Sequence, residues 1–167
     1  MHRKVMNLAF GGMMAALVFV ATYFIKLPVS ITQGYIHLGD GFILLGAALW
    51  GGIAVPAAAV GSMLADLLGG YTLYCLPTFL IKGAVAAVAV WALRSPKPVW
   101  LQIFWMIVAE TVMVVGYFLV EWLVLGYGLA AASGAVIPNV IQGLSGVIIG
   151  AVLSPVLKRV RQLKRSS

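Results

Sequence analysis

Long runs of apolar residues, separated by short polar segments, leave this chain few folds to choose from. Residues 5–25, 42–65 and 99–120 together contain a single charged side chain, Glu110. A helix needs about 20 apolar residues to cross a bilayer, and runs of this length without strand-like alternation favour helices. Of the 167 residues 63% are hydrophobic and 9% are charged, whereas soluble domains are about half apolar and a quarter charged. The chain is therefore expected to be an all-α integral membrane protein.

The number of spans depends on how residues 42–65 are divided. They form either one long helix or two short ones broken at Gly51-Gly52, with Pro56 in the first turn of the second. Basic residues cluster at positions 2–4, 94–97 and 158–165, and only two short helices place all three clusters on one side. Because cytoplasmic loops are rich in Lys and Arg, we expect six helices and cytoplasmic termini, in a bacterial plasma membrane. The predicted helices are approximately 6–25, 41–51, 53–68, 77–93, 99–125 and 136–157, in one domain covering residues 1–167.

A polar segment between the first two predicted helices holds several ionisable and hydrogen-bonding side chains in a chain with few charges. It carries Gln33, Tyr35, His37 and Asp40 within eight residues. We expect it to be an outer loop that gates a small-molecule site, with Asp40 as the N-cap of the next helix.

Several polar residues interrupt the predicted spans. An ionisable group near the bilayer centre costs at least about 2.5 kcal/mol on insertion scales, so it is a functional candidate. Glu110, Tyr117 and Glu121 share one face of the fifth helix, as Asn139 and Gln142 do on the sixth. We expect an outward-opening pocket between the last three helices. The candidate ligand-binding residues are Lys82, Glu110, Tyr117, Asn139, Gln142, Tyr74, Gln33, Tyr35 and His37.

Structural explanations compete with the pocket. Lys82 would then pair with Asp66 or Glu110, and Glu121 would sit near the membrane interface beside Trp122. The outer tyrosines would form an aromatic belt at the headgroups rather than stack on a flat ligand; these are Tyr35, Tyr71, Tyr74 and Tyr127.

Catalytic, metal and nucleic-acid functions find little support. The chain has neither a serine elbow nor a phosphate-binding glycine loop, so we expect it not to be an enzyme. Cys75 is the single cysteine, and His37 with Asp40 supplies only two ligands, so no metal or cofactor is expected. The basic residues flank apolar runs, which indicates membrane topology rather than nucleic-acid binding.

Small residues mark one face of the first helix. Gly11 with Ala15, and Gly12 with Ala16, are spaced four apart, which lets another helix approach closely. We expect this face to dock a partner protein.

Four segments carry a resemblance to a known family. They are GMMAA at 12–16, IHLGDGFILLGAALWGG at 36–52, ADLLGGY at 65–71 and PTFLIKG at 77–83. In these segments and their order the chain resembles the substrate-binding S component of energy-coupling factor (ECF) transporters. The resemblance implies a six-helix vitamin binder that docks, through its first helix, on a transmembrane coupling protein (T component) associated with two ATPases. It also implies that the S component topples in the membrane to release its substrate.

The substrate is expected to be a pyrimidine or pyridine precursor. The chain looks most like members linked to hydroxymethylpyrimidine, pyridoxine-type compounds or pantothenate, and riboflavin is an alternative. A different hypothesis is a stand-alone transporter that couples uptake to protons through Glu110.

Overall fold

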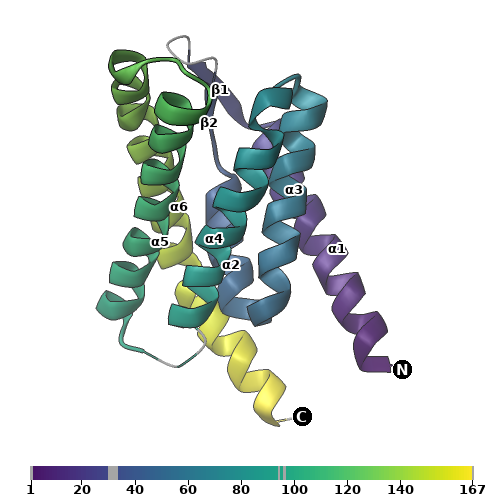
Figure 1. Ribbon diagram of the computed structural model, residues 1–167. Helices are drawn as coiled ribbons and strands as arrows, with labels where there is room; N and C mark the ends of the chain where they lie inside the picture. The colour runs from purple at the N-terminus through teal and green to yellow at the C-terminus, as the bar shows by residue number, and fades with distance from the viewer. Residues whose placement is uncertain (1, 30–33, 94, 96, 167) are drawn as a thin grey trace.

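The computed structural model describes residues 2–29, 34–93, 95 and 97–166. Within these residues six α-helices and one two-stranded sheet follow each other along the chain (Figure 1). The elements are α1 (His2–Tyr23), β1 (Lys26–Val29), β2 (Gly34–His37), α2 (Gly39–Trp50), α3 (Ala54–Gly69), α4 (Cys75–Leu93), α5 (Val99–Leu119) and α6 (Leu129–Ser166). The N-terminal end of α1 and the C-terminal end of α6 lie at the same end of the molecule, and the hairpin of β1 and β2 lies at the opposite end.

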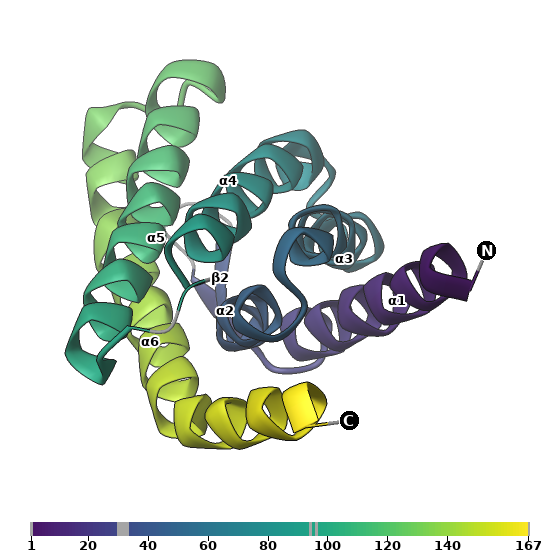
Figure 2. The same cartoon turned by 90° about the horizontal axis from the view of Figure 1, so that it is seen from below.

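The helices form a bundle around α2. This helix packs on α1, α4 and α6, while α3 lies between α1 and α4, as the view from below shows (Figure 2). Ile43, Leu44 and Ala47 of α2 are fully buried. A short helix that is apolar all round belongs in the interior of a bundle rather than against lipid.

A tight turn separates α2 from α3. Gly51 has a positive φ of 62°, a backbone conformation that is strained for residues with a side chain. A short 3₁₀ turn (Gly51–Ile53) then leads into α3. The turn lies where the sequence predicted a break, at Gly51-Gly52. With α2 and α3 taken as one stretch, five helical stretches in the described part of the chain are long and apolar enough to cross a membrane: Lys4–Tyr23, Gly39–Gly69, Thr72–Leu93, Val99–Val124 and Leu129–Leu153.

The segment expected to be a loop after α1 is a β-hairpin. Strands β1 and β2 are antiparallel, with Lys26 opposite His37 and Leu27 opposite Ile36. Each strand has four residues and β1 contains Pro28, so neither shows the alternation by which strands are recognised in a sequence. Gln33 lies outside the described residues.

Two other expectations about helix ends were wrong. Helix α6 begins at Leu129 rather than near residue 136, because the run LAAASGA, expected to be a loop, is rich in alanine, the best helix former. Asp40 does not cap α2: the N-cap position is Leu38, without a side-chain cap, and Asp40 lies in the first turn.

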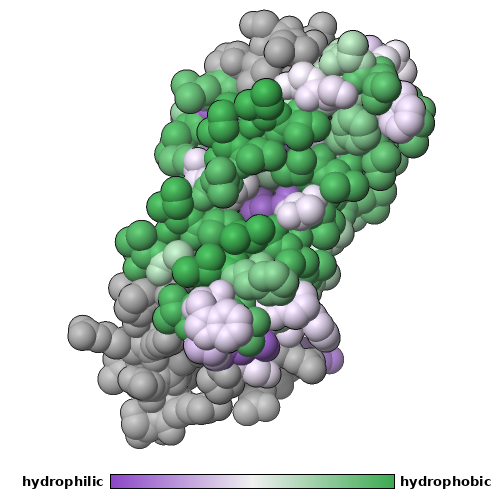
Figure 3. Space-filling model, turned by 90° about the vertical axis from the view of Figure 1, so that its left-hand side faces the viewer, coloured by the Kyte–Doolittle hydropathy of each residue, from purple (hydrophilic) through white to green (hydrophobic). Residues whose placement is uncertain are grey.

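The outer surface is apolar, as a lipid-facing surface must be. The face seen in Figure 3, on the side of α5 and α6, is predominantly hydrophobic, with a small hydrophilic patch in a recess. Ile107, Val115, Ile141 and Ile148 are among the exposed residues of these two helices.

Candidate ligand-binding site

A cavity lies below the hairpin, where strand β2 meets α1, α3, α4, α5 and α6. It holds about 400 Å³ of empty space, counting its opening. Every described residue in its wall carries a polar side-chain atom, although most of the chain is apolar. The wall residues are Thr22, Tyr35, His37, Asp66, Tyr71, Tyr74, Thr78, Tyr117 and Gln142. Such convergence of polar groups in an apolar bundle is typical of a ligand site.

Four of the wall residues are tyrosines. The ring centroids of Tyr35 and Tyr71 are 4.7 Å apart, and those of Tyr74 and Tyr117 are 6.3 Å apart, with interplanar angles of 48° and 50°. Lys26 of β1 stands over the Tyr35 and Tyr71 rings at 5.4 Å from each centroid. Tyrosine offers an apolar ring face together with a hydroxyl, so this wall suits a flat ring with polar substituents.

Two hydrogen bonds orient these tyrosines. The Tyr35 hydroxyl donates to Asp66 Oδ1 at 2.6 Å, and the hydroxyls of Thr78 and Tyr117 are 2.9 Å apart. Burial, reinforced by the neighbouring Asp66 charge, raises the pKa of Tyr35 above its ordinary value. Tyr35 therefore stays protonated and remains a donor.

His37 is a neutral wall residue. Burial lowers the pKa of His37 to about 3; the nearby Asp40 charge opposes this shift and Lys82 adds to it. Its Nδ1 accepts a hydrogen bond from the backbone N–H of Gly39 at 3.0 Å. The ring proton of the neutral imidazole then lies on Nε2, which leaves a hydrogen-bond donor.

A buried ion pair lies beside the cavity. Lys82 Nζ of α4 is 2.6 Å from Asp40 Oδ1 of α2, and both side chains are fully buried. Gln142 Nε2 donates to Asp40 Oδ2 at 2.7 Å, and Gln142 Oε1 accepts from the backbone N–H of His37 at 3.1 Å. Gln142 thus joins the cavity wall, the ion pair and the hairpin. Lys82 has its partner in Asp40 rather than in Asp66 or Glu110.

Five of the predicted ligand-binding residues line the cavity: Tyr35, His37, Tyr74, Tyr117 and Gln142. Lys82 lies behind the wall, where its ammonium is 5.5 Å from the centre of the Tyr117 ring. Asn139 is half-buried and Glu110 is buried, and neither belongs to the wall. Neither oxygen of Glu110 has a hydrogen-bond partner among the described residues.

Four wall residues were not predicted as ligand contacts: Thr22, Asp66, Tyr71 and Thr78. From the sequence, Asp66 is expected only as one alternative partner of Lys82, and Tyr71 either in an aromatic belt or stacked on a flat ligand. Thr22 and Thr78 each lie near the hairpin end of an apolar helix. A polar residue at this end of two apolar helices is the sequence signal that could have identified them as wall residues. Glu121 is buried and accepts a hydrogen bond from the Tyr74 hydroxyl at 3.0 Å, in keeping with the structural role that the sequence favoured for it.

Comparison with known proteins explains this architecture. The model of a family described as "ECF-type riboflavin transporter, S component" matches residues 2–159. This chain belongs to the S components of ECF-type transporters. It is thus a multi-pass protein of the cell membrane and a transport subunit rather than a catalytic one.

Individual relatives agree with this assignment. A solved S component of a bacterial ECF transporter superposes with a TM-score of 0.74 over 94% of this S component and 98% of that chain, at 23% identity, so the two share a fold. The thiamine precursor transporter HmpT of Lactococcus lactis subsp. cremoris (strain MG1363) is 30% identical over 95% of this chain and 91% of its own length. An uncharacterised protein of Pyrococcus woesei is 34% identical over 84% of this chain and 93% of its own.

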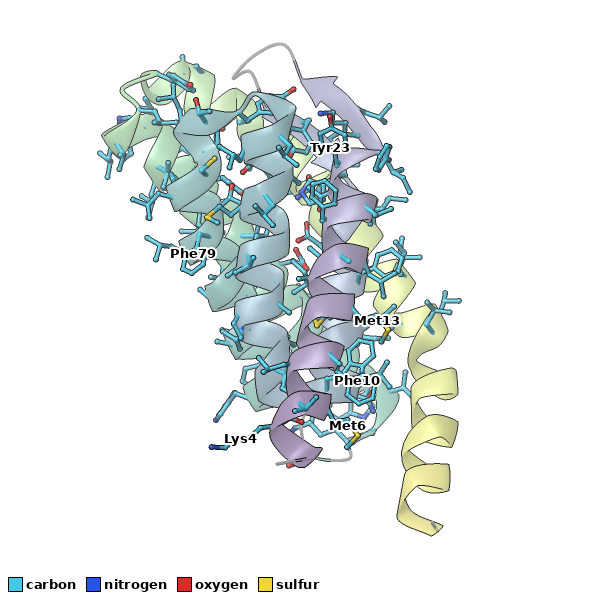
Figure 4. The ribbon with its side chains drawn as sticks, turned by 90° about the vertical axis from the view of Figure 1, so that its right-hand side faces the viewer. Lys4, Met6, Phe10, Met13, Tyr23 and Phe79 are labelled. Carbon is cyan, nitrogen blue, oxygen red and sulfur yellow. The ribbon has the colours of Figure 1, made fainter. Side chains whose placement is uncertain are left out.

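A second hollow of this S component is an apolar groove between α1 and α3. Gly11, Gly12 and Ala15 of α1 line it, opposite Pro56 and Val60 of α3. Lys4 lies at its end, far from Tyr23 near the hairpin (Figure 4). A side chain at Gly12 would point into open space, whereas one at Gly61 would meet the Ala15 carbonyl oxygen at 2.5 Å. The small residues therefore serve two purposes: Gly61 lets α1 and α3 pack closely, and Gly12 leaves the groove open.

Proposed function

We propose that this S component binds hydroxymethylpyrimidine or a pyridoxine-like compound in the cavity below the hairpin. The observation that carries the proposal is the wall itself, in which four tyrosines, an imidazole, a carboxylate and an amide converge in an apolar bundle. The tyrosine rings supply faces for a small heteroaromatic ring, and the other groups supply hydrogen bonds to its substituents. The thiamine precursor named for the relative HmpT belongs to the same chemical class.

Riboflavin is the second candidate, because the family description names it. About 400 Å³ of the cavity is free of protein atoms, but this space includes open solvent, and only about 40 Å³ admits the centre of a water-sized sphere. The cavity therefore has to widen more for a three-ring flavin carrying a ribityl chain than for a single-ring vitamin or a pantothenate-sized compound.

A panel of vitamins tests the substrate. The protein is purified in detergent, any co-purified small molecule is identified by mass spectrometry, and thermal unfolding is measured with each vitamin. A ligand at about 100 times its Kd stabilises the folded state by about 2.7 kcal/mol. We expect stabilisation by the pyrimidine or pyridine compounds; the binding proposal fails if no compound co-purifies and none stabilises.

We further propose that the protein takes up its ligand together with a T component and two ATPases. The groove between α1 and α3 supports docking, since it is apolar, open at Gly12 and bordered by the small residues Gly11 and Ala15. Ala16, one turn after Gly12, is exposed as well. In this arrangement toppling of the bundle in the membrane would bring the cavity to the cytoplasmic side.

Reconstituted vesicles test the partners. We expect ATP-dependent uptake only when the T component and ATPases are present. Uptake without them, abolished by Glu110→Gln, would instead support the proton-coupled alternative, in which the buried Glu110 carboxyl carries the proton.

A further inference from the structure

One wall residue is left with unused hydrogen-bonding capacity. Asp66 is only 4% exposed; its Oδ1 accepts the Tyr35 hydroxyl, and its Oδ2 has no hydrogen-bond partner among the described residues. Thr78 stands beside the same carboxylate, and its hydroxyl is 2.9 Å from that of Tyr117; when Tyr117 donates in this pair, the Thr78 hydroxyl is free to donate to Asp66. A buried carboxylate has four lone-pair positions, so Asp66 can accept further donors from whatever fills the cavity.

The nearby cations do not satisfy this carboxylate. Lys82 is paired with Asp40 on the other side of the cavity wall, and the ammonium of Lys26 lies over the rings of the neighbouring tyrosines. Among the described residues, neither forms an ion pair with Asp66. A buried polar atom without a partner is unfavourable, typically by about 1–3 kcal/mol and more for a charged group.

The position of Asp66 in its helix increases the need of this carboxylate for a hydrogen-bond donor. Asp66 lies in the last turn of α3, which ends at Gly69, and the C-terminus of a helix carries a partial negative charge. A carboxylate there gains most from an N–H donor, and most of all from one with positive charge.

We propose that Asp66 selects ligands by the N–H donor they present, namely an exocyclic amino group or a protonated ring nitrogen on a flat heterocycle. The ring would lie among the tyrosines, with its donor edge toward Asp66 Oδ2. This inference rests on the proposed function, because it names the edge of the ligand that the same cavity recognises. It predicts discrimination against compounds that carry a methyl group in place of the amino group.

Two ligands and two variants test it. The ligands are amino-substituted hydroxymethylpyrimidine and its analogue with a methyl group in place of the amino group, which has a similar shape but no N–H donor. Asp66→Asn removes the charge with little change in shape. Ser62→Ala is the matched control: Ser62 lies one turn earlier on α3, is fully buried and has an unpartnered Oγ, but does not line the cavity.

We expect wild type to bind the amino compound at least about tenfold more tightly than the methyl compound, as a charge-assisted hydrogen bond implies. Asp66→Asn should lose about tenfold or more in affinity for the amino compound and show little discrimination, while Ser62→Ala binds as wild type does. Equal affinity of wild type for both compounds, or undiminished binding by Asp66→Asn, overturns the inference while leaving the proposed function standing. Absence of any vitamin binding by wild type overturns both. If Asp66→Asn does not fold, the comparison of the two ligands on wild type still decides.

Discussion

At the scale of single residues, Gln142 links three parts of the site. Its amide accepts from the hairpin backbone at His37, donates to Asp40 and lines the cavity. Gln142 Nε2 also lies 3.2 Å from the Met113 sulfur. A ligand that displaces this side chain would therefore alter its hydrogen bonds to the ion pair and to the hairpin together.

The ion pair of Lys82 and Asp40 gives a stability prediction. Lys82→Met leaves the Asp40 carboxylate buried without its cation, and breaking a buried pair in this way destabilises by about 3–5 kcal/mol. The double variant Lys82→Met with Asp40→Asn removes both charges. We expect its thermal unfolding midpoint in detergent to lie closer to that of wild type than the midpoint of Lys82→Met does. If the double variant is instead the less stable of the two, the ion pair does not dominate the energetics of this site.

His37 gives a prediction about pH. The folded state holds the pKa of His37 at about 3, below its ordinary value of 6.5, so between these values the unfolded state binds the proton. The stability due to a neutral His37 is therefore complete above about pH 6.5 and declines as the pH falls, by up to about 1.4 kcal/mol per unit.

The variant His37→Asn isolates this contribution. Asparagine retains an acceptor for the Gly39 N–H but has no titrating group. The difference in unfolding free energy between wild type and variant, measured in detergent from pH 7.5 to about pH 5, should shrink or change sign as the pH falls, because only wild type loses the His37 contribution. A constant difference would mean that His37 titrates alike in both states.

At the scale of elements, α1 presents two kinds of glycine environment. Gly12 opens into the groove, and Gly11 would contact Ile53 through an added side chain. On the opposing helix, Gly61 packs against the backbone of α1 at Ala15. The same small-residue pattern thus serves close packing inside the bundle and an open surface outside it.

This contrast predicts different effects for substitutions at the open surface and at the packed interface. Gly12→Leu, or Ala16→Leu, should leave ligand affinity and thermal stability nearly unchanged and abolish uptake with the coupling proteins, since a leucine would fill the docking surface. Gly61→Leu should lower thermal stability whether or not partners are present, since its side chain would force α1 and α3 apart. Ligand binding and vesicle uptake are measured on all three. Equal loss of binding and uptake in Gly12→Leu would give α1 some other role.

Several elements could be predicted from the sequence, and the reasons differ. The break at Gly51-Gly52 followed from the position of the basic clusters, a constraint that the membrane imposes on the whole chain. The hairpin did not, because two strands of four residues carry too little pattern. The polar residues of the wall were visible as exceptions in apolar helices, but their pairing was not. Lys82 and Asp40 are 42 residues apart in the chain, and the choice among Asp40, Asp66 and Glu110 depends on helix packing that a single sequence does not reveal.

At the scale of the whole molecule, the sequence allows α2 and α3 to be counted as one membrane crossing or as two. Helix α2 has 12 residues, about 18 Å at 1.5 Å per residue, and a hydrocarbon core is about 30 Å thick. A short interior helix can still cross when its ends are covered by other elements, here the hairpin at one end and the 3₁₀ turn at the other. We propose that α2 and α3 each cross, so that both termini and the 94–98 linker are cytoplasmic, in keeping with their basic residues.

Single cysteines decide between the two topologies. In a Cys75→Ser background, three exposed positions are replaced in turn: Gly52 at the α2–α3 turn, Ser95 in the linker, and Ala130 at the start of α6. With six crossings, a membrane-impermeant maleimide should label Ala130→Cys in intact cells, and should label Gly52→Cys and Ser95→Cys only after permeabilisation. With α2 and α3 as one crossing, Gly52→Cys would lie within the bilayer and resist labelling in both conditions. Because the two arrangements differ at Gly52 whichever way the termini face, that position alone separates them, and Ser95 and Ala130 then report the orientation.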